Sequence, residues 1–189
     1  IVMGYNGPTS IYNGLATQLS KRFSQGYTLQ VSYTFSRSID TNSEPFGGGA
    51  GQLQNSMEVN NLRLDRGRSA FDATHRFAAN FLWELPFLRG SQGLAGRVLG
   101  GWQVNGIVSL QSGFPFTVLT SEDYNLDGQF TDRPNAATAI SRGIGSGPHS
   151  FLNGVFGAQS EWSGLFVPAA AGTPGNLGRN TFTGPGYAA

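Results

Sequence analysis

A strict alternation of apolar and polar residues from Tyr27 to Ile39 constrains the fold of this chain most. Successive side chains of a β-strand point to opposite faces, so this segment would have one apolar and one polar face. A helix has a period of 3.6 residues and would scatter both sets around its circumference. The segment therefore predicts a long amphipathic strand. Its apolar positions are Tyr27, Leu29, Val31, Tyr33 and Phe35, and its polar positions are Thr28, Gln30, Ser32, Thr34 and Ser36.

Three more segments alternate in the same way and complete the predicted set of strands. The expected strands lie near 10–23, 27–39, 75–87 and 101–118. Ser24, Gln25 and Gly26 make a tight connection, which predicts that the first two strands form a hairpin. Long, irregular, Gly- and Asn-rich connections follow at 40–74 and 119–186. The predicted fold class is all-β, an antiparallel meander of long amphipathic strands.

The apolar faces could meet lipid or the core of a soluble sandwich. Soluble strands commonly run about 5–6 residues, whereas membrane-spanning strands need about 9–11, a length that three of the segments reach. Charged residues make up 12% of the chain, against about a quarter in soluble domains. The polar faces carry Gln, Ser, Asn and Thr rather than the Lys and Glu typical of a sandwich surface. These features favour a fragment of a large transmembrane β-barrel.

The rhythm of the connections supports a barrel and assigns strand directions. Outer-membrane barrels have short periplasmic turns and long outer loops, which predicts that 10–23 and 75–87 run toward the periplasm. The aromatic residues then form two groups, as interfacial anchoring requires. The expected periplasmic group is Tyr27, Trp83, Phe87 and Trp102, and the expected outer group is Phe35, Phe77, Phe114 and Phe116.

About four strands cannot close a membrane barrel, because the smallest single-chain barrels have 8. The chain is then either a segment of a larger barrel or one copy in an oligomeric pore whose copies each donate strands. A third alternative is a soluble or surface β-rich module for adhesion or binding. The expected location for the first two is the cell outer membrane, with its lipid as a partner.

Composition and motifs argue against several other functions. A net charge of +1 offers no electrostatic basis for binding nucleic acid, and the absence of Cys excludes thiolate metal sites. His75 and His149 are far apart in sequence and lack further ligands at metal-site spacing. No nucleophile elbow or phosphate-binding loop is present. We therefore expect no enzymatic activity.

One loop carries a motif for calcium. Asp123, Asn125, Asp127 and Gly128 match the start of a calcium-binding loop, with oxygen ligands at alternate positions and Gly at the turn. The bidentate Glu expected at the twelfth position is replaced by Pro134, so Asp132 would have to serve from another geometry. The competing interpretation is an Asx-rich turn capped by its own side chains. The predicted site is Asp123, Asn125, Asp127 and Asp132, and calcium is the only cofactor predicted.

Five segments, in order, resemble one family of outer-membrane proteins. They are SIYNGLATQLSKRFSQGYTLQVSYTFSRSID, DRGRSAFDATHRFAANFLWELPF, LGGWQVNGIVSLQSGFPFTV, DRPN and GNLGRNTFTGPG. The family comprises Oar-like TonB-dependent receptors that carry a carboxypeptidase-regulatory-like domain. The resemblance covers nearly the whole chain, and its strength lies in the order of the segments, since each alone is weakly specific.

The resemblance implies more than the strands do. It implies a barrel of about 22 strands with a plugged lumen. It also implies transport of a bulky solute across the outer membrane, driven through the TonB system. The expected partners are then the rest of the barrel, the plug, TonB and a solute whose identity the sequence does not give. The plug and the final barrel strands of that family have no counterpart among these 189 residues.

Overall fold

A computed structural model describes residues 7–43, 56–58, 61–86, 93–94, 100–120, 122–128, 130–136 and 166–189. The chain divides into two compact units, each considered by itself. The sheet unit comprises 14–35, 74–112 and 186–189, and the loop unit comprises 1–13, 36–73 and 113–185. No helix among the described residues is long and apolar enough to cross a membrane.

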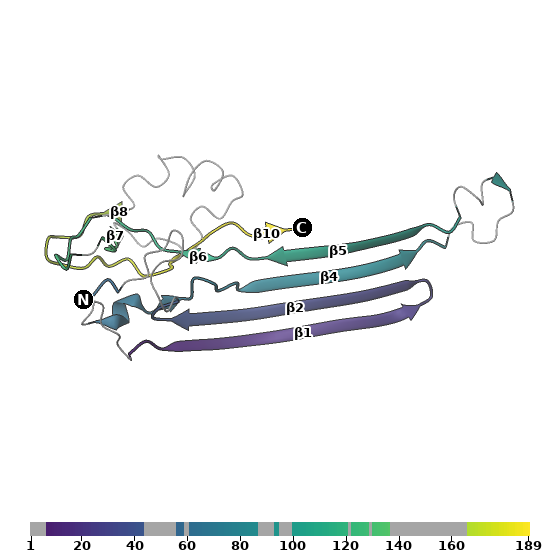
Figure 1. The fold of residues 1–189 in the computed structure, drawn as a ribbon, viewed down its shortest axis with the longest axis horizontal. Coiled ribbons are helices and arrows are strands. Elements are labelled where there is room, and N and C mark those ends of the chain that lie inside the picture. The colour runs from purple at the N-terminus through teal and green to yellow at the C-terminus, as the bar shows by residue number, and fades with distance from the viewer. Residues whose placement is uncertain are drawn as a thin grey trace. The chain divides into compact units, whose positions relative to one another are not determined.

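The predicted antiparallel meander is confirmed. β1 (Ser10–Ser24), β2 (Tyr27–Asp40), β4 (His75–Glu84) and β5 (Gln103–Gln111) lie side by side in chain order (Figure 1). A short strand, β10 (Tyr187–Ala188), pairs antiparallel with β5 at the end of this row. The hairpin between β1 and β2 turns on Gln25 and Gly26, both with positive φ, which is the type I′ geometry that suits strand twist.

Two predicted strand ends need correction. The expected strand 75–87 ends at Glu84, and Phe87 lies outside the described residues. The expected strand 101–118 is wrong beyond Gln111, where β5 ends. Gly113 lies against the backbone of Gly184, and the Phe114 carbonyl accepts a hydrogen bond from the Gly184 N–H at 2.8 Å. The chain therefore leaves the ladder and pairs with a different segment.

The register between strands sorts the side chains by face. Tyr27 lies opposite Trp83, and Trp83 opposite Val104, on one face. Val31, Ala79 and Val108 form an equivalent row in the middle of the same face. The other face carries Gln30 opposite Asn80. Ile107 is a large apolar residue on this polar face, where it lies opposite Asn80 and is 77% exposed.

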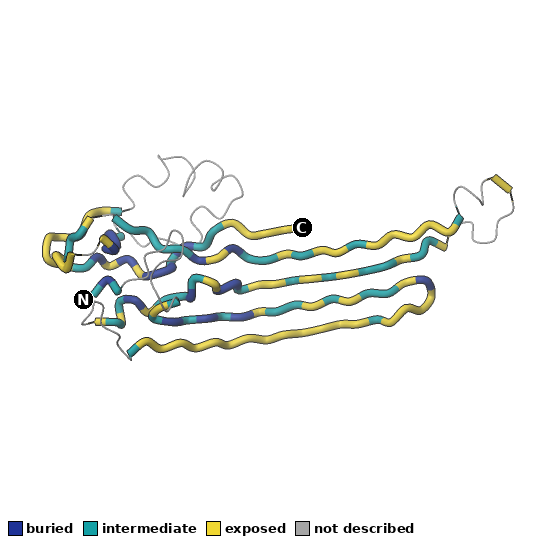
Figure 2. The backbone as a smooth tube through the Cα atoms, in the orientation of Figure 1, coloured by how far each residue is buried: buried dark blue, intermediate teal, exposed yellow. Residues whose placement is uncertain are grey.

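β1 pairs with β2 along the edge of the sheet. The Thr41 N–H donates to the Thr9 carbonyl at 3.1 Å, just beyond the ends of these two strands. Lys21 Nζ lies 4.2 Å from the centre of the Tyr27 ring, on the apolar side of the hairpin end. Leu15 and Leu19 of β1 are each more than 60% exposed. Figure 2 shows β1 as almost entirely exposed.

The loop unit contains short elements only. They are η1 (Leu62–Asp65), β3 (Gly67–Arg68), β6 (Pro115–Phe116), β7 (Asn135–Ala136), β8 (Phe166–Val167) and β9 (Phe182–Thr183). β3 pairs with the end of β2, β6 with β9, and β7 with β8. All three pairings are antiparallel. The regions expected to be irregular, 40–74 and 119–186, therefore contain local pairing that alternation did not reveal.

The buried apolar residues among those described all belong to the loop unit. They are Met57, Ala73, Ala169, Leu177 and Phe182. Phe116 packs on Phe182 with ring centres 5.8 Å apart, and Val118 packs on the same cluster. The alternation had placed Phe116 and Val118 on the lipid-facing surface, and that assignment is wrong. Both follow Pro115, where the chain has already left the long sheet.

Candidate functional sites on the sheet and in the loops

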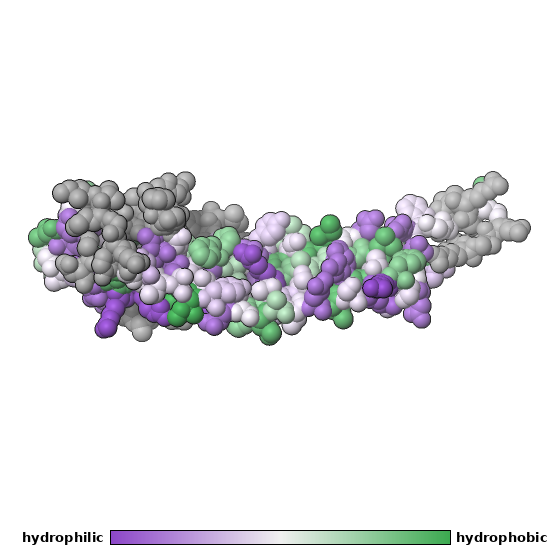
Figure 3. All heavy atoms as spheres, turned by 60° about the horizontal axis from the view of Figure 1, so that its bottom comes forward, coloured by the Kyte–Doolittle hydropathy of each residue, from purple (hydrophilic) through white to green (hydrophobic). Residues whose placement is uncertain are grey.

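The sheet unit is a single layer whose apolar side chains remain exposed. Trp83, Val104 and Leu110 are each about 45% exposed. Hydrophobic side chains reach the surface along the strands (Figure 3). A soluble sandwich would bury this face against a second sheet, but the described residues of the sheet unit form one sheet only. A continuous apolar face of this kind marks a membrane or partner surface.

Close packing stabilises this apolar face. A Cβ placed on Gly106 would lie 2.9 Å from two ring carbons of Phe81, the residue directly opposite. The ring of Phe81 therefore covers the space that a side chain at Gly106 would fill. An aromatic ring over a cross-strand glycine restores apolar contact at a position that otherwise weakens a sheet.

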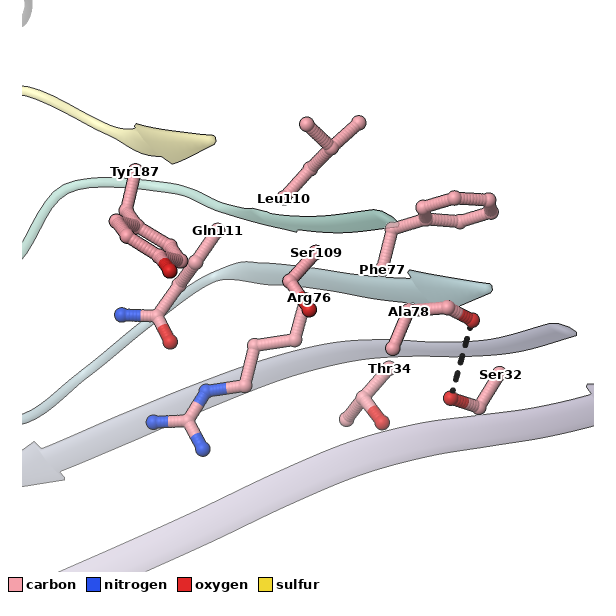
Figure 4. Close-up of a pocket in the computed structure, with 9 residues that line it drawn as sticks. All are labelled: Ser32, Thr34, Arg76, Phe77, Ala78, Ser109, Leu110, Gln111 and Tyr187. Atoms are coloured by element: carbon pink, nitrogen blue, oxygen red, sulfur yellow. Dashed lines mark hydrogen bonds between the residues drawn. The ribbon is translucent and has the colours of Figure 1, made fainter. Parts of the chain in front are cut away.

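The polar face carries an open hollow of about 320 Å³ near the start of β4. Arg76 and Gln111 lie opposite one another there, and Thr34 lies opposite Arg76 on the other side (Figure 4). Tyr187 completes this row from β10. The alternation predicts that Arg76 and Glu84 share the polar face, where in a barrel they could touch plug or solute, or pair with each other or across strands. They stand at opposite ends of β4, which excludes pairing between them.

His75 belongs to an aromatic group at the start of β4. The Tyr33 hydroxyl lies 2.9 Å from His75 Nδ1, and the Phe35 ring centre lies 5.3 Å from that of His75. Hydrogen bonding and ring contact thus account for this imidazole. His149, the second histidine, lies outside the described residues.

Buried ion pairs join distant segments within the loop unit. Arg133 donates to Asp65 at 2.9 Å, and both side chains are less than 5% exposed. Arg133 also donates to the carbonyl oxygens of Leu177 and Leu64, each at 2.8 Å. Arg179 pairs with Asp40 and donates to the Asp65 carbonyl at 2.7 Å. Two guanidinium groups thus connect four chain segments.

Hydrogen bonds extend these ion pairs into a cluster. Arg68 pairs with Asp72 at 2.8 Å, and the Ser38 N–H donates to the same carboxylate at 2.8 Å. Asn180 donates to the Arg68 carbonyl at 2.6 Å, and Ser69 is fully buried. Every buried polar side-chain atom among the described residues has a hydrogen-bond partner. A satisfied network of this kind holds a fixed arrangement of loops.

The residues of this buried polar cluster come from segments that the sequence analysis singled out, but the sequence did not predict that these residues interact. DRGRSAFD contributes Asp65 and Asp72, DRPN contributes Arg133, and GNLGRN contributes Arg179. The available signal was the concentration of Arg, Asp and Asn at turn-like motifs in a chain with few charges overall. Buried charges are rare unless paired, so charged residues in otherwise uncharged loops are candidates for internal ion pairs.

The predicted calcium loop forms a set of Asx turns. Asp123 accepts hydrogen bonds from the backbone N–H groups of Asp127 and Gly128, at 3.1 and 2.9 Å. Asp132 is 1% exposed and accepts from the N–H groups of Tyr124 and Asn125. Among the described residues, no three acidic or histidine side chains converge as a metal site would require. Calcium binding at Asp123, Asn125, Asp127 and Asp132 stays a prediction.

Tyr124 in this loop has a perturbed acidity. A side-chain hydrogen bond with Glu122 is the main cause that raises the pKa of Tyr124, and desolvation adds to it. The neutral phenol is thus favoured as a donor to the carboxylate. This pair stands beside the turn.

Comparison with known proteins fits this two-faced sheet. The outer membrane beta barrel domain family matches residues 1–189, the entire chain. The chain belongs to this family. Its place is therefore the outer membrane, and the apolar face of its sheet contacts lipid. No curated protein and no solved structure matches the chain significantly.

Membership of this barrel family indicates what each face of the sheet contacts. Residues such as Val31, Ala79 and Val108 face hydrocarbon, and Gln30, Asn80 and Arg76 face the barrel interior. The four long strands contain 15, 14, 10 and 9 residues, enough to cross the membrane when tilted.

Proposed function

We propose that this chain forms part of the wall of a TonB-dependent receptor-like transporter that moves a bulky solute across the outer membrane. The observation that carries the proposal is the buried polar cluster of the loop unit. Segments that resemble the Oar-like receptors meet there through Asp65, Arg133 and Arg179. Because the cluster needs several of these segments at once, it supports a relationship to the Oar-like receptors that does not depend on any one short motif.

A larger barrel supports transport of a bulky solute. Unpaired N–H and C=O groups at a sheet edge cost several kcal/mol each in lipid, so four long strands need further strands to close. β10 supports continuation, since Tyr187 and Ala188 pair with β5 at one edge of the meander. In this proposal the other strands belong to the same protein and bring the total to about 22, a size that encloses a plugged lumen.

The proposal includes a plug and energy transfer through TonB. A wide barrel without a plug would leak small solutes, so a receptor of this class keeps its lumen filled until TonB acts. The resemblance supplies this part of the proposal, and neither partner is contained in the chain. The solute remains unspecified.

The test uses the full-length protein produced in a Gram-negative host and purified in detergent. The proposal expects a monomeric barrel that shows no steady conductance in planar bilayers and is retained by the purified periplasmic domain of TonB. Steady large conductance together with no retention by TonB would contradict it. A discrete detergent-resistant oligomer would instead favour the pore whose copies each donate strands.

A further inference from the structure

The hollow on the polar face follows from the register of the strands. One row across them consists of small residues, Ser32, Ala78 and Ser109. The adjacent row carries the longer Thr34, Arg76 and Gln111, with Tyr187 beyond. Small side chains beside long ones leave a depression, and Figure 4 shows the Arg76 and Gln111 side chains bordering it, while Leu110 turns away.

The chemistry of the hollow is rich in donors and carries a single charge. The Arg76 guanidinium makes no hydrogen bond or ion pair with any described residue, and no carboxylate lines the hollow. The hydroxyl groups of Thr34, Ser109 and Tyr187 and the amide of Gln111 are likewise without side-chain partners in the described part of the chain. Ser32 differs, because its hydroxyl donates to the Ala78 carbonyl at 3.4 Å.

We infer that this hollow is a subsite for an oxyanion, a carboxylate or phosphate group seated on Arg76. A guanidinium offers a planar fork of donors that matches both groups in a bidentate manner. The Arg76 side chain is exposed and has no carboxylate beside it in the hollow, so its guanidinium is accessible to an anionic occupant. The hydroxyl and amide groups around it supply further donors to the remaining oxygens.

This inference rests on the proposed function, because only a closed barrel makes the polar face line a lumen. The oxyanion can come from a free solute or from a carboxylate elsewhere in the same protein. Either oxyanion would bind the Arg76 guanidinium in the same way, and the experiment distinguishes the two sources.

The experiment measures binding of citrate and of inorganic phosphate to the full-length detergent-solubilised protein by calorimetry. Three variants are compared with the wild type. Arg76→Gln removes the charge, Ala78→Leu fills the floor and keeps the charge, and Arg22→Gln removes an exposed positive charge outside the hollow. Heat-dependent mobility on gels first establishes that each variant is a folded barrel.

A free solute as the source predicts that citrate or phosphate binds the wild type and Arg22→Gln alike. Binding should fall at least tenfold in both Arg76→Gln and Ala78→Leu. An internal carboxylate as the source predicts no binding of either probe, together with a lower unfolding midpoint for Arg76→Gln than for Arg22→Gln.

Binding unaffected by Arg76→Gln would overturn the inference. So would the absence of binding together with equal midpoints for the two arginine variants. If the protein forms a barrel but Arg76→Gln changes neither binding nor the unfolding midpoint, only the oxyanion subsite is refuted. If the wild-type protein does not form a barrel, the transporter proposal itself is refuted.

Discussion

Arg133 has three hydrogen-bonding contacts concentrated on one guanidinium in the loop unit. It bonds Asp65, Leu64 and Leu177 while only 3% exposed. The carbonyl preceding Pro134 also passes within van der Waals contact of Gly175, where a Cβ would lie 1.8 Å from the Arg133 oxygen. Both the side chain and the backbone at this position therefore depend on the segment around 175–177.

Replacing Arg133 with Leu should destabilise the loop unit by about 3–5 kcal/mol, since it leaves the Asp65 carboxylate buried without its partner. The measurement is limited proteolysis of the full-length protein, with fragments located by mass spectrometry. Arg66→Leu is the matched control, because Arg66 is exposed and lies next to the same aspartate in sequence. Equal protease resistance of the two variants would show that the ion pair is dispensable.

The turn between Asp123 and Asp132 provides the prediction for calcium. If the ion binds, 100-fold excess over Kd should stabilise the folded protein by about 2.7 kcal/mol. Chelation should then lower the unfolding temperature of the wild type and have little effect on Asp127→Asn. Glu122→Gln, which alters a neighbouring carboxylate outside the motif, should keep the response. If chelator does not change the unfolding temperature, the calcium prediction is wrong and the loop is an Asx-rich turn only.

At the scale of elements, β4 offers two adjacent alanines on opposite faces. Ala79 lies between Val31 and Val108, and Ala78 lies between Ser32 and Ser109. A lysine on the lipid face near mid-membrane costs about 2–4 kcal/mol, while the lumenal face is hydrated. Ala79→Lys should therefore fold into vesicles less stably than Ala78→Lys by that amount, measured by denaturant titration. Equal stabilities would mean that both alanines face water.

Strands were predictable because alternation is a local signal. Tyr27–Asp40 and Ser10–Ser24 match the expected ranges to within one residue. The end of β5 was not predictable in this way, because Phe114, Phe116 and Val118 keep the alternation after the chain has left the ladder. A tertiary pairing between β6 and β9 decides that boundary, and its partner lies far away in sequence.

The candidate sites likewise divide into features that the local sequence pattern predicted and features that depend on tertiary contacts. Arg76 was assigned to the polar face from its position alone, but its neighbours Gln111 and Tyr187 required the strand register. The ion pair between Arg179 and Asp40 joins residues far apart along the chain, and no periodicity encodes it. Interactions across such separations depend on how the loops close, which a single sequence does not display.

For the whole molecule, one assignment underlies the others: the face that carries Val31, Ala79 and Val108 meets lipid, and the face that carries Gln30, Asn80 and Arg76 meets water. Membership of the barrel family and the uncovered apolar face both lead to it. Transport, the plug and the oxyanion subsite all depend on it, because each needs a lumen behind the polar face. A sheet buried within a soluble body would leave none of them.

The most direct test places single cysteines along β4, in a chain that has no cysteine of its own. Spin labels at Phe77, Ala79 and Phe81 are compared with labels at Ala78, Asn80 and Leu82 in vesicle-reconstituted full-length protein. The account predicts that the first set collides mainly with oxygen dissolved in lipid, and the second mainly with a water-soluble nickel chelate. Equal accessibility to the chelate on both sets, or the reverse pattern, would contradict it.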